Sequence, residues 1–179
     1  MKGLKAISAI VVLSFMVISQ KANAQIPGID IKPQIQLPIE TLQIESTPNP
    51  NSREDARKAQ AYFKKGIELF EAGKLNEAIQ AFNEVIKIQP NNQYAYFFRG
   101  VSYLKLKKYQ QAKLDLDKSI VLDNSISYSY YFRGITNYLL GNKNSAITDL
   151  QTAAKLFEKD ENTRMAKKSR DVIQYIRNA

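Results

Sequence analysis

The chain has 179 residues, and 44% of them are hydrophobic, which is enough for one domain with a buried core. It contains no cysteine and no histidine, which excludes disulfides, thiol chemistry and any catalysis or metal binding by imidazole. Its 26 basic and 17 acidic residues give a formal charge of +9, which favours acidic partners or anionic surfaces.

The first 24 residues are typical of a secretory signal peptide. Lys2 and Lys5 precede an apolar run from Ala6 to Ile18, and the small residues of Ala22-Asn23-Ala24 follow. The run has 13 residues, whereas a membrane-spanning helix needs about 20, which disfavours the alternative of an uncleaved anchor. We therefore expect cleavage between Ala24 and Gln25 and an exported protein, which is periplasmic, lumenal or secreted.

Residues 25–51 are predicted to be a linker. They include five of the six prolines, which disfavour both helix and central strand. Apolar residues recur at two-residue steps or a multiple of two, on one face of an extended chain: Ile29, Ile31, Ile35, Leu37 and Ile39. Burying an isoleucine at every second residue contributes about 1.5–3 kcal/mol, whereas ordering each residue costs about 1–2 kcal/mol. For each pair of residues, the gain and the cost nearly cancel. We expect a disordered linker; the alternatives are a semi-rigid spacer and a strand that docks on a partner or on the repeats.

The remaining chain contains one pattern three times, at a spacing of 34 residues. Three sets of residues keep this spacing: Gly66, Gly100 and Gly134; Ala78, Ala112 and Ala146; Phe82, Leu116 and Leu150. The pattern resembles the tetratricopeptide repeat family, whose helix–turn–helix units stack into a solenoid. The resemblance implies an all-α, right-handed solenoid with repeats at 59–92, 93–126 and 127–160. The small residues let the two helices of a repeat approach closely, so we assign the three sets to the core.

Apolar residues at three- and four-residue steps predict seven helices in residues 52–179, the predicted repeat domain. Ser52 is predicted as the N-cap of the first helix, and Gly73-Lys74 as its end. The other helices are predicted near Leu75–Ile88, Tyr94–Leu106, Tyr109–Leu122, Tyr128–Leu140, Lys143–Phe157 and Glu161–Asn178. The last, the predicted cap of the solenoid at 161–178, carries one largely apolar stripe: Met165, Ser169, Val172, Ile173 and Ile176.

The resemblance also implies a binding surface, because in this family the first helix of each repeat lines a concave groove. It places twelve side chains there: Gln60, Phe63, Ile67, Phe70, Tyr94, Phe97, Val101, Leu104, Tyr128, Tyr131, Ile135 and Tyr138. We predict that all but Gln60 and Leu104 contact an extended or helical peptide, because a large exposed apolar patch usually marks a binding surface. The alternative is that individual rings pack between adjacent helices.

One group in this family binds the tails of chaperones, through lysine and asparagine side chains that clamp the terminal carboxylate. The resemblance places the equivalent positions at Phe63, Ile67, Phe98, Tyr128 and Phe132. None of these side chains can form an ion pair with a carboxylate, so the resemblance does not extend to this specificity.

Basic residues form a second candidate site, in two groups: Lys105, Lys107 and Lys108 at the turn of the second repeat, and Lys167, Lys168 and Arg170 on the predicted cap. Runs of charge are usually solvated surface. The alternative is contact with an anionic polymer or a membrane surface, which would depend strongly on salt.

We therefore expect a protein–protein interaction scaffold that binds a peptide or partner segment. The alternative is a binder of an anionic polymer or a membrane surface; nucleic acid is disfavoured, because exported proteins rarely meet it. An enzyme is also disfavoured, because the sequence has no phosphate-binding loop, metal-ligand cluster or nucleophile–base pair. Asp115 and Asp149 are equivalent positions of the repeat, which explains them without catalysis. No metal and no cofactor are predicted.

Overall fold

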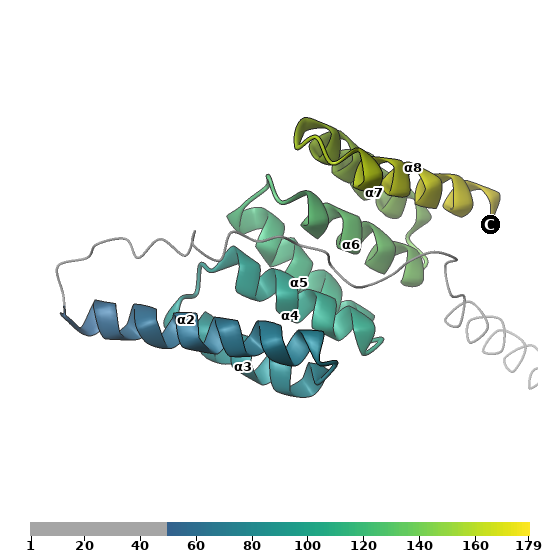
Figure 1. The fold of residues 1–179 in the computed structure, drawn as a ribbon. Coiled ribbons are helices and arrows are strands. Elements are labelled where there is room, and N and C mark those ends of the chain that lie inside the picture. Colours follow the sequence, from purple (N-terminus) through teal and green to yellow (C-terminus); the bar gives the residue numbers. More distant parts are fainter. Residues whose placement is uncertain (1–49) are drawn as a thin grey trace, which may run out of the picture. The chain divides into compact units, whose positions relative to one another are not determined.

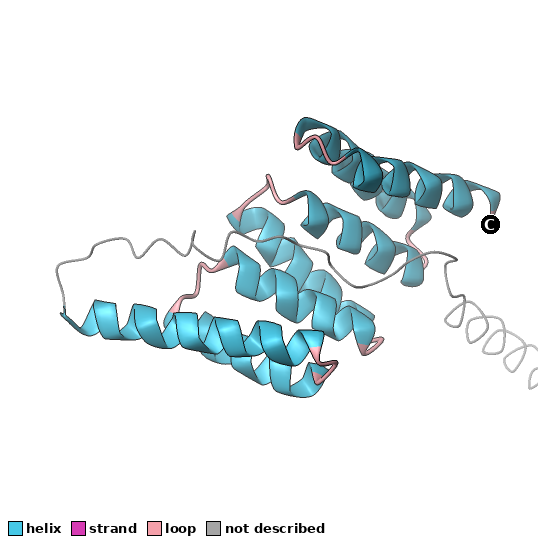
Figure 2. Cartoon of the chain, viewed as in Figure 1, coloured by secondary structure: helices cyan, strands magenta, loops and turns pink. Residues whose placement is uncertain are grey.

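The computed structural model describes residues 50–179. The predicted signal peptide and the predicted linker up to residue 49 lie outside the described residues. The described part consists of seven α-helices without a strand (Figure 1, Figure 2). These are α2 (Pro50–Glu71), α3 (Leu75–Ile88), α4 (Gln93–Lys105), α5 (Tyr109–Leu122), α6 (Ser127–Leu139), α7 (Lys143–Lys159) and α8 (Thr163–Asn178). The predicted all-α repeat fold is confirmed.

The helices pair into three hairpins, α2 with α3, α4 with α5 and α6 with α7, and α8 packs on α7 (Figure 1). Neighbouring hairpins are joined through contacts of α3 with α4 and of α5 with α6. The first helices of successive hairpins also touch, α2 with α4 and α4 with α6. Three hairpins and a final helix correspond to the three predicted repeats and the predicted cap.

The boundaries of six helices agree with the predicted ones to within two residues, but the predicted N-cap of the first helix is wrong. Helix α2 begins at Pro50, so Ser52 lies inside its first turn. A proline is tolerated in the first turn, because the N–H that it lacks would have no partner in the helix. Helix α8 begins at Thr163 rather than Glu161, because the side chain of Asn162 caps it and accepts a hydrogen bond from the Met165 N–H at 3.1 Å.

The repeated glycines lie where the two helices of a hairpin come closest. A Cβ atom at Gly134 would lie 2.8 Å from Cγ of Leu150 and 3.1 Å from the carbonyl oxygen of Ala146. A Cβ atom at Gly66 would lie 2.6 Å from the ring of Phe82. The predicted close approach is confirmed, and it explains why glycine recurs at this position of the repeat.

The turn of each hairpin contains one residue with a positive φ, and the three residues are again 34 apart. They are Gly73 (φ 74°), Lys107 (φ 59°) and Gly141 (φ 85°). Glycine adopts this conformation without steric cost, whereas a side chain does not. Lys107 is therefore the strained member of the set.

The stripe predicted for the cap is buried in α8: Met165, Ser169, Val172, Ile173 and Ile176. Four cations of α8 outside this stripe are exposed: Arg164, Lys167, Arg170 and Arg177. Helix α8 thus covers α7 with one face and presents a polar face to solvent, as a cap must. Among the described helices, none combines the length and the hydrophobicity that a membrane crossing requires.

Candidate functional site

The structure buries six of the ten side chains that the sequence predicted as peptide contacts. These are Phe63, Phe70, Phe97, Val101, Tyr131 and Ile135, each with an exposed fraction of 5% or less. A buried side chain offers a ligand no surface, so the prediction is corrected for these six: they belong to the core.

These side chains are buried because aromatic rings of neighbouring first helices contact each other. The contacting rings are 35 residues apart, one more than the repeat length. The ring centroid of Phe63 on α2 lies 5.9 Å from that of Phe98 on α4, and Phe97 lies 5.9 Å from Phe132 on α6. Each pair is 35 residues apart, so a ring of one first helix packs on the next first helix. Aromatic rings at these distances and inclined to each other stabilise a core beyond the area that they bury.

Phe98 is the centre of this aromatic core. Its ring centroid lies 5.7 Å from that of Phe82, 5.8 Å from Phe70 and 5.0 Å from Phe97. The helical period of the sequence identifies this apolar face, but it does not separate a ring that faces a groove from one that faces the next helix.

The other four predicted contacts, Ile67, Tyr94, Tyr128 and Tyr138, are partly exposed. They lie on the first helices α2, α4 and α6, and Tyr94 and Tyr128 occupy equivalent positions of two repeats. Tyr128 packs edge-on against Phe157 at 4.8 Å. These four residues form the surface that we call the first-helix surface.

The tyrosines of the first-helix surface are neutral at physiological pH. Burial raises the pKa of Tyr94, and the charge of Asp123 raises it further. Burial also raises the pKa of Tyr128 against the opposing effect of a hydrogen bond with Asn162, and it raises the pKa of Tyr138, to which Tyr175 contributes. Each phenol can therefore donate a hydrogen bond while its ring packs on an apolar group.

Tyr131 differs from these tyrosines because its hydroxyl is buried. The side chain is 1% exposed, and its Oη has no hydrogen-bond partner among the described residues. Burial, with a smaller contribution from Tyr128, raises the pKa of Tyr131. The Tyr131 hydroxyl is therefore not part of the first-helix surface.

The predicted basic residues lie on two elements. At the turn between α4 and α5, Lys105 Nζ lies 4.5 Å from the ring centroid of Phe70, and Lys107 and Lys108 are exposed. Amine–ring contacts of this kind are favourable.

On α8, Lys167 pairs with Asp171 at 2.8 Å and Arg170 pairs with Glu158 of α7. Lys168 is partly buried. Two of the three predicted cations of the cap thus have acidic partners, which lowers the positive charge that this surface presents to an anionic polymer.

Two arginines that the sequence analysis did not single out connect the hairpins. Arg99 on α4 donates two hydrogen bonds to Asp115 on α5, both at 2.7 Å, and a third to Asn83 on α3 at 2.6 Å. The signal was present in the sequence, because an arginine and an aspartate 16 residues apart recur 34 residues later as Arg133 and Asp149. These arginines have structural partners, so we assign them no ligand.

The chain matches two family models, one described as "TPR repeat" over residues 66–107 and one as "Tetratricopeptide repeat" over residues 94–125. No curated protein sequence matches it.

Solved structures with the same fold were also found. The second TPR of Spaghetti (RPAP3), bound to the HSP90 peptide SRMEEVD, is 30% identical with a TM-score of 0.55; the match covers 58% of this chain and 98% of that one. The second TPR domain of human RPAP3, in complex with the HSP70 peptide SGPTIEEVD, is 27% identical with a TM-score of 0.61, covering 69% and 98%. The first TPR of Spaghetti (RPAP3), bound to the same HSP90 peptide, is 25% identical with a TM-score of 0.62, covering 68% and 92%.

Proposed function

Because the chain belongs to the tetratricopeptide repeat family, we propose that it is a non-enzymatic scaffold that binds a peptide or partner segment on its first-helix surface. The observation that carries the proposal is the presence of partly exposed tyrosines, Tyr94, Tyr128 and Tyr138, on the first helices of successive repeats. Tyrosine is a favourable anchor, because it buries a large area, freezes few torsions and donates a hydrogen bond. Similar structures of 25–30% identity hold peptides, as their descriptions state, which supports the same class of ligand here.

The ligand that we propose has apolar or aromatic side chains and differs from a chaperone tail. At the positions that the family resemblance assigns to the carboxylate clamp, Phe98 and Phe132 are buried, and Tyr128 is the most polar residue. No cation stands at these positions, so a terminal carboxylate would lose its water without gaining an ion pair.

We also propose that the protein is exported, on the basis of the signal-peptide pattern in residues 1–24. The measurement is the mass of the protein recovered from outside the cytoplasm. We expect a polypeptide that begins at Gln25, and an intact Met1 in the exported protein would refute cleavage.

The alternative function is binding of an anionic polymer or a membrane surface through the exposed Lys107 and Lys108. Their exposure favours it, as does the formal charge, which is +9 for the whole sequence and +6 once cleavage removes Lys2, Lys5 and Lys21. It predicts binding that moderate salt abolishes, whereas contacts with the first-helix surface should depend little on salt.

The test of the first-helix surface is selection of peptides from a random display library by the full chain. The selected peptides are then measured against the double variant Tyr94→Ala/Tyr128→Ala and the control Lys107→Ala/Lys108→Ala. We expect apolar and aromatic peptides, at least about tenfold weaker binding to the tyrosine variant, and unchanged binding to the control. Equal binding to both variants would show that the peptides bind elsewhere.

A further inference from the structure

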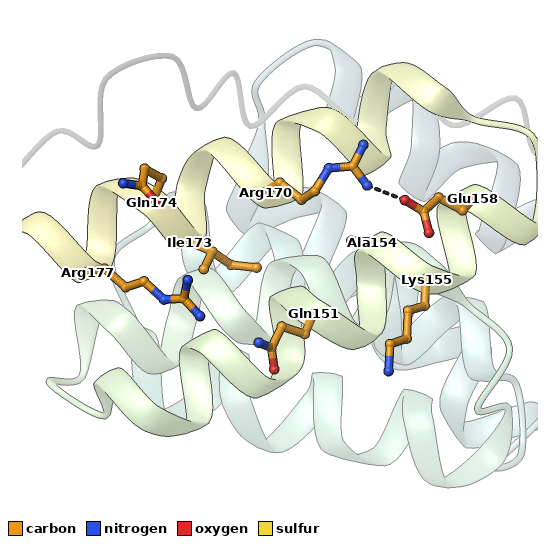
Figure 3. A pocket seen from close by; sticks show the side chains of 8 residues that line it. All are labelled: Gln151, Ala154, Lys155, Glu158, Arg170, Ile173, Gln174 and Arg177. Atoms are coloured by element: carbon orange, nitrogen blue, oxygen red, sulfur yellow. Dashed lines mark hydrogen bonds and ion pairs between the residues drawn. The ribbon is translucent and has the colours of Figure 1, made fainter.

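A cleft lies between α7 and α8, and none of the residues that line it belongs to the first-helix surface (Figure 3). Its volume is about 550 Å³, and four side chains from each helix line it: Gln151, Ala154, Lys155 and Glu158 of α7, and Arg170, Ile173, Gln174 and Arg177 of α8. Both sets have the spacing i, i+3, i+4, i+7, which places each set on one helix face over two turns. The cleft is thus a furrow that runs along both helices.

The furrow has an apolar floor and charged sides. Ala154 and Ile173 are buried, whereas the six polar and charged side chains are exposed. Glu158 pairs with Arg170 at one end of the furrow (Figure 3). Among the described residues, no carboxylate lies within ion-pair distance of Lys155 or Arg177. Two positive charges thus line the furrow without an acidic partner in residues 50–179.

The repeats explain why this furrow is open, because in the earlier repeats an arginine crosses the equivalent place. Arg99 of α4 donates to Asn83 of α3 at 2.6 Å, and Arg133 of α6 donates to Asp117 of α5 at 2.8 Å. The equivalent cleft between α3 and α4, which Arg99 helps to line, has a volume of about 270 Å³.

Between α7 and α8 this bridge is absent from the described residues. The position of the two arginines is occupied by Lys167, which pairs with Asp171 of its own helix at 2.8 Å. The position of their acceptors on the preceding helix is occupied by Gln151, which lines the cleft instead. In the furrow between α7 and α8, no arginine therefore occupies this space, and the Gln151 side chain lines the cleft instead of accepting a hydrogen bond from an arginine.

We propose that this furrow is a second binding site, which takes an acidic helical segment of a protein partner. Carboxylates of the segment pair with Lys155 and Arg177, and an apolar side chain of the same helix face packs on Ala154 and Ile173. The amides of Gln151 and Gln174 lie beside this path as further hydrogen-bond donors and acceptors.

The make-up of the furrow favours such a helix over an anionic polymer. A polymer of phosphates or sulfates has no apolar group for the floor, and it would approach the carboxylate of Glu158. The furrow runs for two turns along each helix, which is about 10 Å at 1.5 Å per residue. A groove of this kind suits the docking of an amphipathic helix.

The probe is a synthetic helical peptide of about 15 residues, with leucines on one face flanked by glutamates. Matched peptides carry glutamine or lysine in place of the glutamates. Each is titrated into the full, isotope-labelled chain, and backbone NMR shifts and fluorescence anisotropy report its place and affinity. We expect shifts confined to α7 and α8 and the strongest binding for the glutamate peptide.

Charge reversal then tests the pairing. The variant Lys155→Glu/Arg177→Glu is expected to bind the glutamate peptide at least about tenfold more weakly and to gain binding of the lysine peptide. Both side chains are exposed, and circular dichroism checks that the variant folds. The control Lys107→Glu/Lys108→Glu keeps the same net charge change away from the furrow, and its affinity should stay unchanged.

Three results would overturn the proposal: no shifts in α7 or α8 at about 1 mM peptide, equal loss of affinity in the control, or displacement of the peptide by polyphosphate that itself shifts the furrow. The last result would assign the furrow to polyanions. Tyr94→Ala/Tyr128→Ala should leave this binding unchanged, so failure of the furrow and failure of the first-helix surface are separate outcomes.

Discussion

Arg133 on α6 holds the carboxylate of Asp149 on α7 with two hydrogen bonds, from Nε at 3.0 Å and from Nη2 at 2.6 Å. Its remaining Nη1 reaches back to Asp117 on α5 at 2.8 Å, and Asn137 donates to the same Asp149 at 2.8 Å. Burial lowers the pKa of Arg133, but the hydrogen bonds and the negative charges of Asp149 and Asp117 together outweigh this effect and raise the pKa. One side chain thus ties both helices of the third repeat to the second repeat.

We predict that Asp149→Ala lowers the free energy of unfolding by about 2–4 kcal/mol, because Nε and Nη2 of the partly buried Arg133 and the amide of the buried Asn137 lose their acceptor, and Arg133 keeps only its bond to Asp117. Urea unfolding followed by circular dichroism measures it. The matched control is Asp171→Ala, which breaks the exposed pair with Lys167 and should cause no measurable change. Equal effects of the two substitutions would show that the bridge contributes no more than a surface pair.

Removing the buried hydroxyl of Tyr131 should change the stability at high pH. Its pKa is raised in the folded chain, so the unfolded chain loses this proton first, and stability falls as pH rises above about 10. Tyr131→Phe should remove this part of the alkaline loss. At pH 7 it should be neutral or stabilising by up to about 1 kcal/mol, because the hydroxyl has no hydrogen-bond partner among the described residues.

The measurement is a series of urea unfolding curves from pH 7 to above pH 10, for wild type and Tyr131→Phe. The control is Tyr62→Phe, which removes the hydroxyl of a tyrosine whose side chain is 37% exposed. Marked destabilisation of Tyr131→Phe at pH 7 would show that the hydroxyl has a partner after all.

Relief of backbone strain should stabilise the second hairpin. We predict that Lys107→Gly raises the free energy of unfolding by about 0.5–1 kcal/mol, because φ is 59° at this residue. The neighbouring Lys108 has φ −86°, so Lys108→Gly gains nothing and should destabilise instead. Thermal or urea unfolding of the two variants gives opposite signs if the turn is as described.

Two aromatic residues of α4 should separate the core from the first-helix surface. Phe98→Ala opens a cavity among four rings and should lower the free energy of unfolding by about 3–5 kcal/mol. Tyr94→Ala, four residues away and partly exposed, should cost about 1 kcal/mol or less. If Tyr94→Ala were as damaging as Phe98→Ala, Tyr94 would be a packing residue and would be unsuitable as a ligand anchor.

The helices could be predicted from the sequence to within three residues, because the 34-residue spacing records a contact that every repeat needs. Gly66 and Gly134 recur since any Cβ would collide with the facing helix. The candidate site was predicted less well. Phe63 and Phe97 are 34 residues apart, a spacing that residues facing a groove would also show. Only the position of the next helix shows that they pack on Phe98 and Phe132.

The furrow between α7 and α8 was not predictable for a related reason. Lys155 and Arg177 lie 22 positions apart, and no periodicity connects them. They face one cleft because α8 packs along α7, a tertiary contact that helix propensity does not encode. The bridge of Arg133 to Asp149 lies between these cases, since its partners repeat together and a search for charges that recur in pairs would find it.

The contacts between aromatic rings 35 residues apart affect how the repeats unfold. Because Phe98 packs simultaneously on rings of α2, α3 and α4, detaching the first hairpin would expose the aromatic core of the second. In a linear array, such strong coupling between neighbours suppresses partly unfolded species. The three hairpins should therefore exchange their amide hydrogens as one cooperative unit, while α8, which packs mainly on α7, frays first.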